Sequence, residues 1–221
     1  MIRKHPMTFK RSTWALGLGI SLLCATAFAA GVPSLNDADL GKGSFSKMHM
    51  MLEKTILAVD VATIDVRVAP QAEQKFSEIA KGKPYSPALE SELAKVALSA
   101  DNAVIQLQFV RDVSLNQWID GVRESLVKAE QAGLIDGGLR AKVSSGLPEW
   151  FKALQDSGFH DGDRVLYRIS PGVLRTVAVT KDGKVAVDRT DTGPDKTKLV
   201  LASYFAPGTD YRALLLRSLG K

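Results

Sequence analysis

A histidine beside two carboxylates is the first group in this 221-residue chain whose residue types could bind a metal. His160, Asp161 and Asp163 surround Gly162, and imidazole with carboxylate oxygens is a ligand set that Zn²⁺ accepts. The same tetrapeptide has the composition of a turn, because short polar side chains there bond to nearby backbone groups. His49 is remote in sequence. Since a turn explains the pattern without a ligand, we expect no metal site and no cofactor.

Nucleophilic catalysis has no recognisable set of residues in this sequence. No serine stands in the G-x-S-x-G pattern that exposes the nucleophile of α/β-hydrolases. The one cysteine, Cys24, lies in the N-terminal segment, and no glycine-rich phosphate loop occurs. We therefore assign no catalytic residue. Whether the protein is an enzyme stays open, and the sequence argues against it.

Two charged residues, Arg111 and Asp112, directly follow an apolar stretch and precede the strongest helix pattern of the chain. Two interpretations remain open for them. They can form a structural ion pair or cap at the surface, or they can lie at the rim of a pocket. We keep Arg111 as a candidate ligand-pocket residue.

The N-terminal residues 1–29 have the three-part layout of a secretion signal. Basic residues come first, an uncharged apolar run follows, and small residues end at Ala29. The run is shorter than the roughly 20 residues that a membrane-spanning helix needs. We expect cleavage after Ala29, a periplasmic location in a bacterium, and no stable membrane anchor afterwards. An uncleaved anchor and acylation of Cys24 are the alternatives.

The charge of the chain lies mostly in that segment. Its basic residues are Arg3, Lys4, Lys10 and Arg11. They account for most of the formal charge of +5, and the remaining about +1 provides no basic stripe for nucleic acid. After cleavage no cysteine remains, so we expect no disulfide. Residues 30–42 are polar and predict a leader segment, and residues 43–221 predict one domain.

Alternating apolar and polar residues predict β-strands in several parts of the chain. Residues 45–68 consist mostly of strand formers, and residues 102–110 and 164–169 predict further strands. Residues 176–187 predict a hairpin in which Asp182 and Gly183 form a two-residue primed turn.

Helical spacing of apolar residues predicts the remaining elements. In the strongest pattern, Ser114 and Gln117 form a capping box, Trp118 lies on the apolar stripe, and Gly133 ends the helix. The other predicted helices are 71–79, 87–98, 139–145, 148–154, 196–205 and 210–219, with a break at Gly146. The order of elements predicts an α+β fold, an antiparallel β-sheet with helices packed on one face.

Four stretches of the sequence carry a family resemblance: GFHDGDRVLYRISPGVLRTVAV (158–179), RALLLRSL (212–219), FVRDVSLNQWIDGVRESLV (109–127) and KTILAVDVATIDVRV (54–68). With them, the sequence resembles the chalcone isomerase family over nearly all of the expected domain. It implies an open-faced sandwich with a cleft between helices and sheet. In the plant enzymes of the family a flavonoid ring closes in this cleft, with the help of an arginine, a tyrosine, an asparagine, a threonine and a lysine.

The resemblance places other residue types at those positions. The tyrosine aligns with Trp118, whose indole donates a hydrogen bond but transfers no proton. The asparagine aligns with Ser125, and the threonine with Thr55 or Leu57. The arginine aligns with Gly43 or Phe45, neither of which is a cation, and the lysine has no clear counterpart. In the fatty-acid-binding relatives, the same arginine and tyrosine positions hold the ligand carboxylate. The residues that this sequence has at these positions therefore argue against isomerase chemistry and against the binding of a carboxylate.

The sequence therefore predicts an exported, non-catalytic protein resembling this family that binds a lipid or other apolar small molecule in the cleft. The candidate ligand-pocket residues are Phe45, Met51, Thr55, Leu57, Arg111, Trp118 and Ser125. Two alternatives remain: an isomerase or intramolecular lyase with an unidentified substrate, and an envelope protein-interaction domain whose cleft is filled by side chains. The sequence predicts no nucleic-acid partner and leaves the oligomeric state open.

Overall fold

The computed structural model describes residues 46–54 and 59–220. All described residues belong to one compact unit. The predicted signal, the predicted leader and their boundaries lie outside the described residues. Within the described part, no helix is both long enough and apolar enough to cross a membrane.

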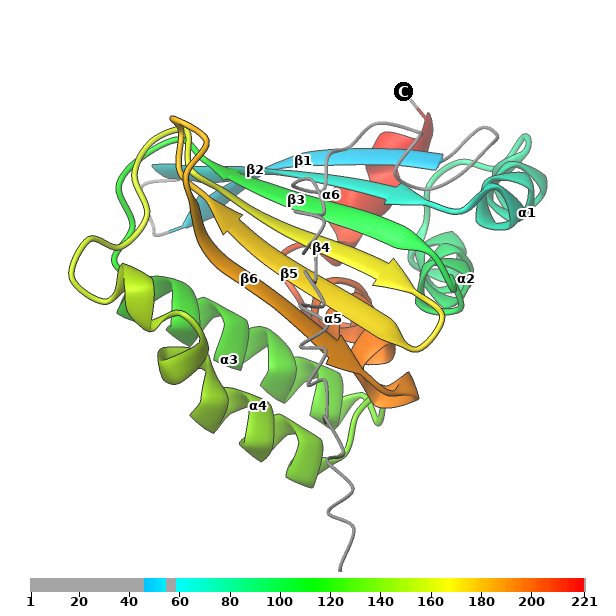
Figure 1. Ribbon diagram of the computed structural model, residues 1–221. Helices are drawn as coiled ribbons and strands as arrows, with labels where there is room; N and C mark the ends of the chain where they lie inside the picture. The colour runs from blue at the N-terminus through cyan, green and yellow to red at the C-terminus, as the bar shows by residue number, and fades with distance from the viewer. Residues whose placement is uncertain (1–45, 55–58, 221) are drawn as a thin grey trace, which may run out of the picture. The chain divides into compact units, whose positions relative to one another are not determined.

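The described strands form one sheet in which each strand lies antiparallel to the next strand in the chain (Figure 1). The strands are β1 (Ser46–Lys54), β2 (Val59–Val68), β3 (Ala103–Phe109), β4 (Arg164–Ser170), β5 (Val173–Val179) and β6 (Val185–Thr192). The prediction of an antiparallel sheet is confirmed.

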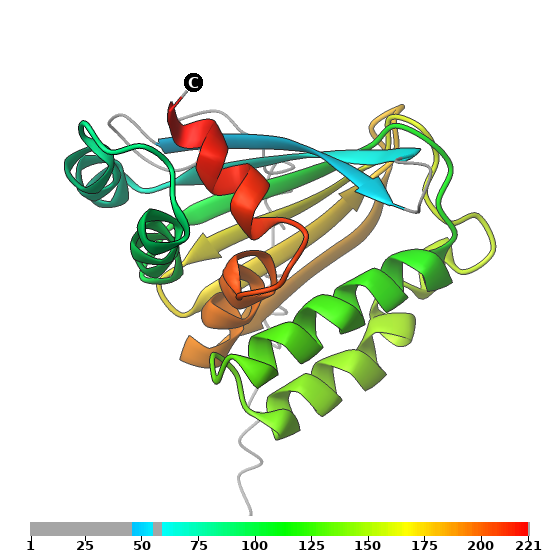
Figure 2. The same cartoon turned by 180° about the vertical axis from the view of Figure 1, so that it is seen from behind.

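Between residues 59 and 220, four α-helices lie in the β2–β3 and β3–β4 connections, and two more follow β6. They are α1 (Pro70–Ala80), α2 (Pro87–Leu98), α3 (Leu115–Gln131), α4 (Gly137–Trp150), α5 (Pro194–Phe205) and α6 (Arg212–Arg217), with short 3-10 helices at Lys152–Leu154 and Ser218–Gly220. Seen from behind, α5 and α6 lie across the sheet, with α3 and α4 beside them (Figure 2). The helices therefore pack on one face of the sheet, as the sequence predicted.

One face of the sheet forms the core because its apolar side chains are in register across all the strands. A single row of paired positions runs through Met50, Ile64, Leu107, Val165, Ala178 and Val187, all of them buried. Since side chains alternate along a strand, this row fixes which residues of each strand face the helices. On β4, β5 and β6 the inward positions include Tyr167, Thr176 and Arg189.

Helix α3 begins with the predicted capping box. The backbone N–H of Gln117 donates to the Ser114 hydroxyl at 3.2 Å, and the Ser114 N–H donates to the Gln117 side-chain oxygen at 3.0 Å. The apolar stripe buries Trp118 and Leu126. Gly133 has a φ of +70°, a left-handed conformation that favours glycine, so the predicted stop is confirmed.

The predicted break at Gly146 is wrong, because α4 runs through both Gly146 and Pro148. Proline has no N–H to donate to the carbonyl four residues earlier, which is that of Ser144. The guanidinium of Arg123 in α3 donates to this carbonyl at 3.1 Å instead. Gly146 has a packing role, since a Cβ there would collide with the indole of Trp150.

The turn of the β5–β6 hairpin also differs from the prediction. Thr180 and Lys184 are hydrogen bonded at 2.9 Å, so three residues form the loop instead of two. The N–H of Gly183 donates to the Thr180 carbonyl, and Gly183 has a φ of +88°. A register shift follows between Ala178 and Val179. This is the three-residue hairpin with a bulge, in which glycine takes the left-handed position.

Replacing Ser114 with alanine should lower the free energy of unfolding by about 1 kcal/mol, because the N–H of Gln117 in the first turn of α3 loses the hydroxyl that accepts its hydrogen bond. Urea unfolding followed by circular dichroism measures the change. Ser145→Ala is the matched control, since Ser145 is exposed within α4, and we expect a change below about 0.5 kcal/mol. Equal effects of the two substitutions would show that the capping box contributes nothing.

Candidate functional site

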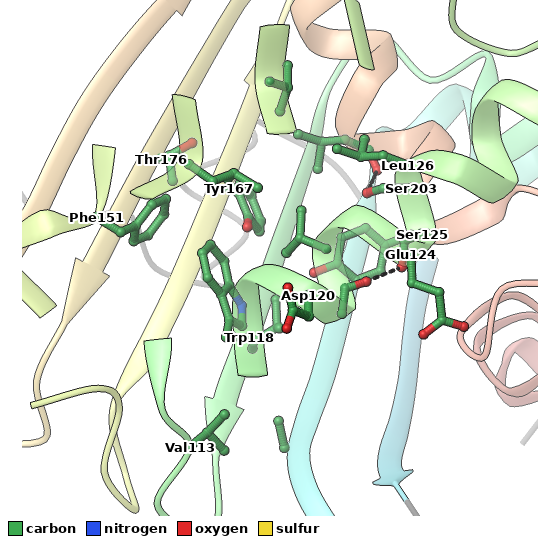
Figure 3. Close-up of a pocket in the computed structure, with 18 of the residues that line it drawn as sticks. Val113, Trp118, Asp120, Glu124, Ser125, Leu126, Phe151, Tyr167, Thr176 and Ser203 are labelled. Atoms are coloured by element: carbon green, nitrogen blue, oxygen red, sulfur yellow. Dashed lines mark hydrogen bonds between the residues drawn. The ribbon is translucent and has the colours of Figure 1, made fainter. Parts of the chain in front are cut away.

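A cavity of about 560 Å³ lies between α3, α5 and the inward face of the sheet. Its volume is within the range of about 300–1,000 Å³ that is typical of small-molecule sites. Tyr167 and Thr176 approach it from the sheet, and Trp118, Asp120 and Ser125 approach it from α3 (Figure 3). The cleft beside Trp118 is therefore hollow.

An aromatic cluster is made of Phe109, Trp118, Phe151 and Phe159, of which the first three line the cavity. The rings of Phe109 and Phe159 stack with centroids 4.3 Å apart. Trp118 packs against Phe159 at 5.5 Å and against Phe151 at 4.5 Å. Such ring pairs add about 0.5–1.5 kcal/mol each beyond the area that they bury. The cluster therefore fixes the first turn of α3 to β3 and to the segment after α4.

A tyrosine cluster of Tyr167, Tyr204 and Tyr211 also lines the cavity. The ring centroids of Tyr167 and Tyr204 are 6.5 Å apart, and those of Tyr204 and Tyr211 are 5.0 Å apart. Burial raises the pKa of the Tyr167 phenol and of the Tyr204 phenol well above the ordinary value. Both phenols are therefore neutral at physiological pH and can donate a hydrogen bond.

An ion pair on β6 lies in the cavity wall. Arg189 and Asp191 are two residues apart on one strand, so both side chains point to the same face. The guanidinium donates two hydrogen bonds to the Asp191 carboxylate, at 2.7 and 2.6 Å. It also lies over the indole of Trp150, 4.1 Å from the ring centroid. The carboxylate and the indole together fix the position of Arg189.

The structure brings three of the predicted pocket residues together. Trp118 and Ser125 lie in the wall on α3, and Arg111 lines the cavity from the segment before α3. Ser125 is buried, and its hydroxyl donates to the Gly121 carbonyl at 3.0 Å. Arg111 and Asp112 are both exposed and both line the cavity, which agrees with the interpretation of a pocket rim.

Of the other predicted pocket residues, the structure describes Met51, which is not in the wall of the cavity. Met51 lies between the buried Met50 and Leu52 on β1, so strand alternation turns it to the opposite face. Leu52 lines the cavity in its place. Phe45, Thr55 and Leu57 lie outside the described residues.

Sequence reasoning missed the residues of the sheet that contribute polar groups to the cavity. These are Tyr167, Thr176, Arg189 and Asp191, with Tyr204 added by α5. A signal for them exists in the hairpin: once Val187 is placed inward, Arg189 and Asp191 must follow on the same face. Charged residues at inward positions of a strand are unusual unless they are paired or bind a ligand.

The histidine and its neighbours form the predicted turn. The buried carboxylate of Asp163 accepts hydrogen bonds from the backbone N–H of His160 at 2.8 Å and of Lys181 at 2.9 Å. His49 pairs with Asp65 at 2.7 Å on β1 and β2. Among residues 46–54 and 59–220, no group of three or more histidine, cysteine, aspartate and glutamate side chains is placed to hold a metal ion.

Comparison with known proteins identifies the fold. No protein-family model matches the sequence, and no curated protein matches it. The solved structure of a fatty-acid binding protein of Arabidopsis thaliana is similar, with a TM-score of 0.51 and 14% sequence identity, over 79% of this chain and 85% of that one. The open antiparallel sheet with helices on one face is the chalcone isomerase-like fold, which confirms the predicted fold class.

Three of the tyrosines should ionise at a higher pH in the folded protein than in the unfolded chain. Burial, with help from Glu90, raises the pKa of Tyr85 to about 12, and the pKa values of Tyr167 and Tyr204 are also raised. At pH about 11, all four tyrosines of the unfolded chain ionise, whereas these three keep their protons in the folded protein. The unfolded state then binds fewer protons, so stability is unaffected by these groups below pH about 10 and falls above it.

Ultraviolet absorbance of tyrosinate, with circular dichroism to confirm folding, measures this titration. Tyr167→Phe is the control, because it should remove one tyrosinate from the unfolded titration at pH about 11 and none from the folded one. Complete ionisation of the folded protein at that pH would contradict the burial of the tyrosine cluster.

Proposed function

We propose that this protein binds a lipid or other apolar small molecule in the cavity between α3, α5 and the sheet. The observation that carries the proposal is the cavity itself, whose walls are mostly apolar and whose volume is about 560 Å³. Water that fills this space contacts mostly apolar walls, so an apolar ligand that displaces the water buries these walls and gains free energy. The similar structure is named as a fatty-acid binding protein, which supports an apolar ligand.

The proposal includes a periplasmic location and the absence of catalysis. The location is supported by the signal-like pattern of residues 1–29. The absence of catalysis is supported by Trp118, which occupies the position where the resemblance expects a tyrosine. It is supported further by Tyr167 and Tyr204, whose raised pKa values keep the protons on the phenols. The protein then holds its ligand and releases it unchanged.

An isomerase or intramolecular lyase is the second candidate, and one observation favours it. The cavity wall contains Arg189 together with the tyrosine cluster. A cation and phenols are therefore present, although they lie on different elements from those that the resemblance implies. Against this candidate, Asp191 occupies the guanidinium edge that would otherwise stabilise a developing anion. Conversion of a chalcone above the spontaneous rate would favour the enzyme.

Filling the cavity tests the binding proposal directly. Gly121 lines the cavity on α3 between Trp118 and Ser125, and a Cβ added there would meet no atom within 4 Å. Gly121→Phe should therefore occupy the cavity without a clash, while removing a helix-weakening glycine. We expect affinity for Nile red, an uncharged apolar dye, to fall at least about tenfold, as measured by fluorescence titration.

Val127→Phe is the matched control for that experiment. Val127 is on the same helix but 37% exposed and not part of the cavity wall, so this substitution should leave dye affinity unchanged. Urea unfolding checks that both variants are at least as stable as the parent protein. Equal dye affinity of the Gly121→Phe variant and the parent protein would refute binding in this cavity.

A further inference from the structure

We propose that the cavity selects ligands with an uncharged polar group over carboxylates of the same chain length, because Asp191 neutralises Arg189 within the cavity wall. The inference rests on the proposed function and names the ligand class of the same site. Fatty alcohols, esters and ketones belong to the selected class, and ionised fatty acids do not.

The pairing of Arg189 with Asp191 removes the net charge that would attract an anion. Asp191 takes two of the five N–H groups of the guanidinium, so the remaining N–H groups can still donate to a ligand, but without a net positive charge behind them. Trp150 covers one face of the guanidinium at 4.1 Å. A ligand carboxylate at this place would therefore meet the negative charge of Asp191 together with the positive charge of Arg189.

The other charges of the cavity wall do not restore a positive field. The wall contains three cations, Arg111, Arg189 and Lys196, and four carboxylates, Asp112, Asp120, Glu124 and Asp191. Arg111 is exposed beside Asp112, and Lys196 is partly exposed in the first turn of α5, so water weakens the attraction of both for an anion. Asp120 pairs with Arg123 at 3.3 Å and Glu124 pairs with Lys128 at 2.7 Å, so cations outside the wall compensate these two carboxylates, and the charges of the wall leave no strong positive field for an anion.

The tyrosine cluster provides groups that suit an uncharged polar head. Within the described part of the chain, the hydroxyls of Tyr167 and Tyr204 make no hydrogen bond to a protein group, and both side chains line the cavity. A phenol both donates and accepts, so it satisfies an alcohol, an ester carbonyl or a ketone equally well. A buried polar group gains most from a ligand that completes its hydrogen bonds, and a neutral ligand gives this without the cost of burying a charge.

The test compares dodecanol with dodecanoate at pH about 8, where the carboxylic acid is ionised. The fluorescence of Trp118 and Trp150, which both line the cavity, reports binding. We expect dodecanol to bind at least about tenfold more tightly than dodecanoate to the parent protein. In the Asp191→Asn variant, Arg189 keeps its charge without a counterion, so dodecanoate affinity should rise about tenfold while dodecanol affinity stays the same.

Two further variants separate this effect from a general change in charge. Asp188→Asn removes the partner of Arg175, which donates to Asp188 at 2.9 and 2.7 Å on the other face of the same hairpin, and it should leave both affinities unchanged. The double variant Arg189→Gln with Asp191→Asn removes both charges of the cavity pair. It should keep the preference for dodecanol.

The outcomes distinguish the two proposals. Tighter binding of dodecanoate than dodecanol by the parent protein, or an unchanged dodecanoate affinity in the Asp191→Asn variant, would overturn this inference while leaving ligand binding intact. Binding of neither compound, together with no Nile red binding, would overturn the proposed function and this inference with it.

Discussion

Aromatic packing between the helices and the sheet is the constraint on which the cavity depends. Trp118 is wedged against Phe151 and Phe159, and Phe159 stacks on Phe109 of β3. On another side, Tyr167 of β4 meets Tyr204 of α5. These rings are too large for the helices to settle directly on the strands, and their contacts hold both layers in place. The space between the two clusters is therefore part of the packed structure.

The placement of charge then decides what the space can hold. In most cores an arginine on an inward strand position would be costly, and here Asp191 and Trp150 make it tolerable. The carboxylate also neutralises the charge of the guanidinium, so a ligand meets N–H donors without a net positive charge. Trp150 is itself seated by Gly146, which leaves room for the indole in α4. One wall of the cavity therefore has polar groups without a net charge. Gly146, Trp150 and the Arg189–Asp191 ion pair together produce this arrangement.

Much of the fold was readable from the sequence because its signals are local. The capping box of Ser114 and Gln117, the strand alternation and the stop at Gly133 each lie within a few residues, and each is present in the structure. The continuity of α4 was not readable, because Arg123 of another helix compensates for Pro148. The cavity was only half readable. Trp118 lies on the predicted stripe of α3 and Ser125 was suggested by the family resemblance, whereas Arg189 and Tyr167 reach the cavity through sheet register, which depends on pairing between distant residues.

Native mass spectrometry of the protein purified from its own cells tests the account most directly, because the cavity should not remain empty where lipids are available. The account predicts a protein ion that carries one small molecule, released on denaturation and uncharged in its polar group. A protein that is consistently found without any bound molecule, and that takes up none from a lipid extract, would contradict a ligand-binding role for this cavity.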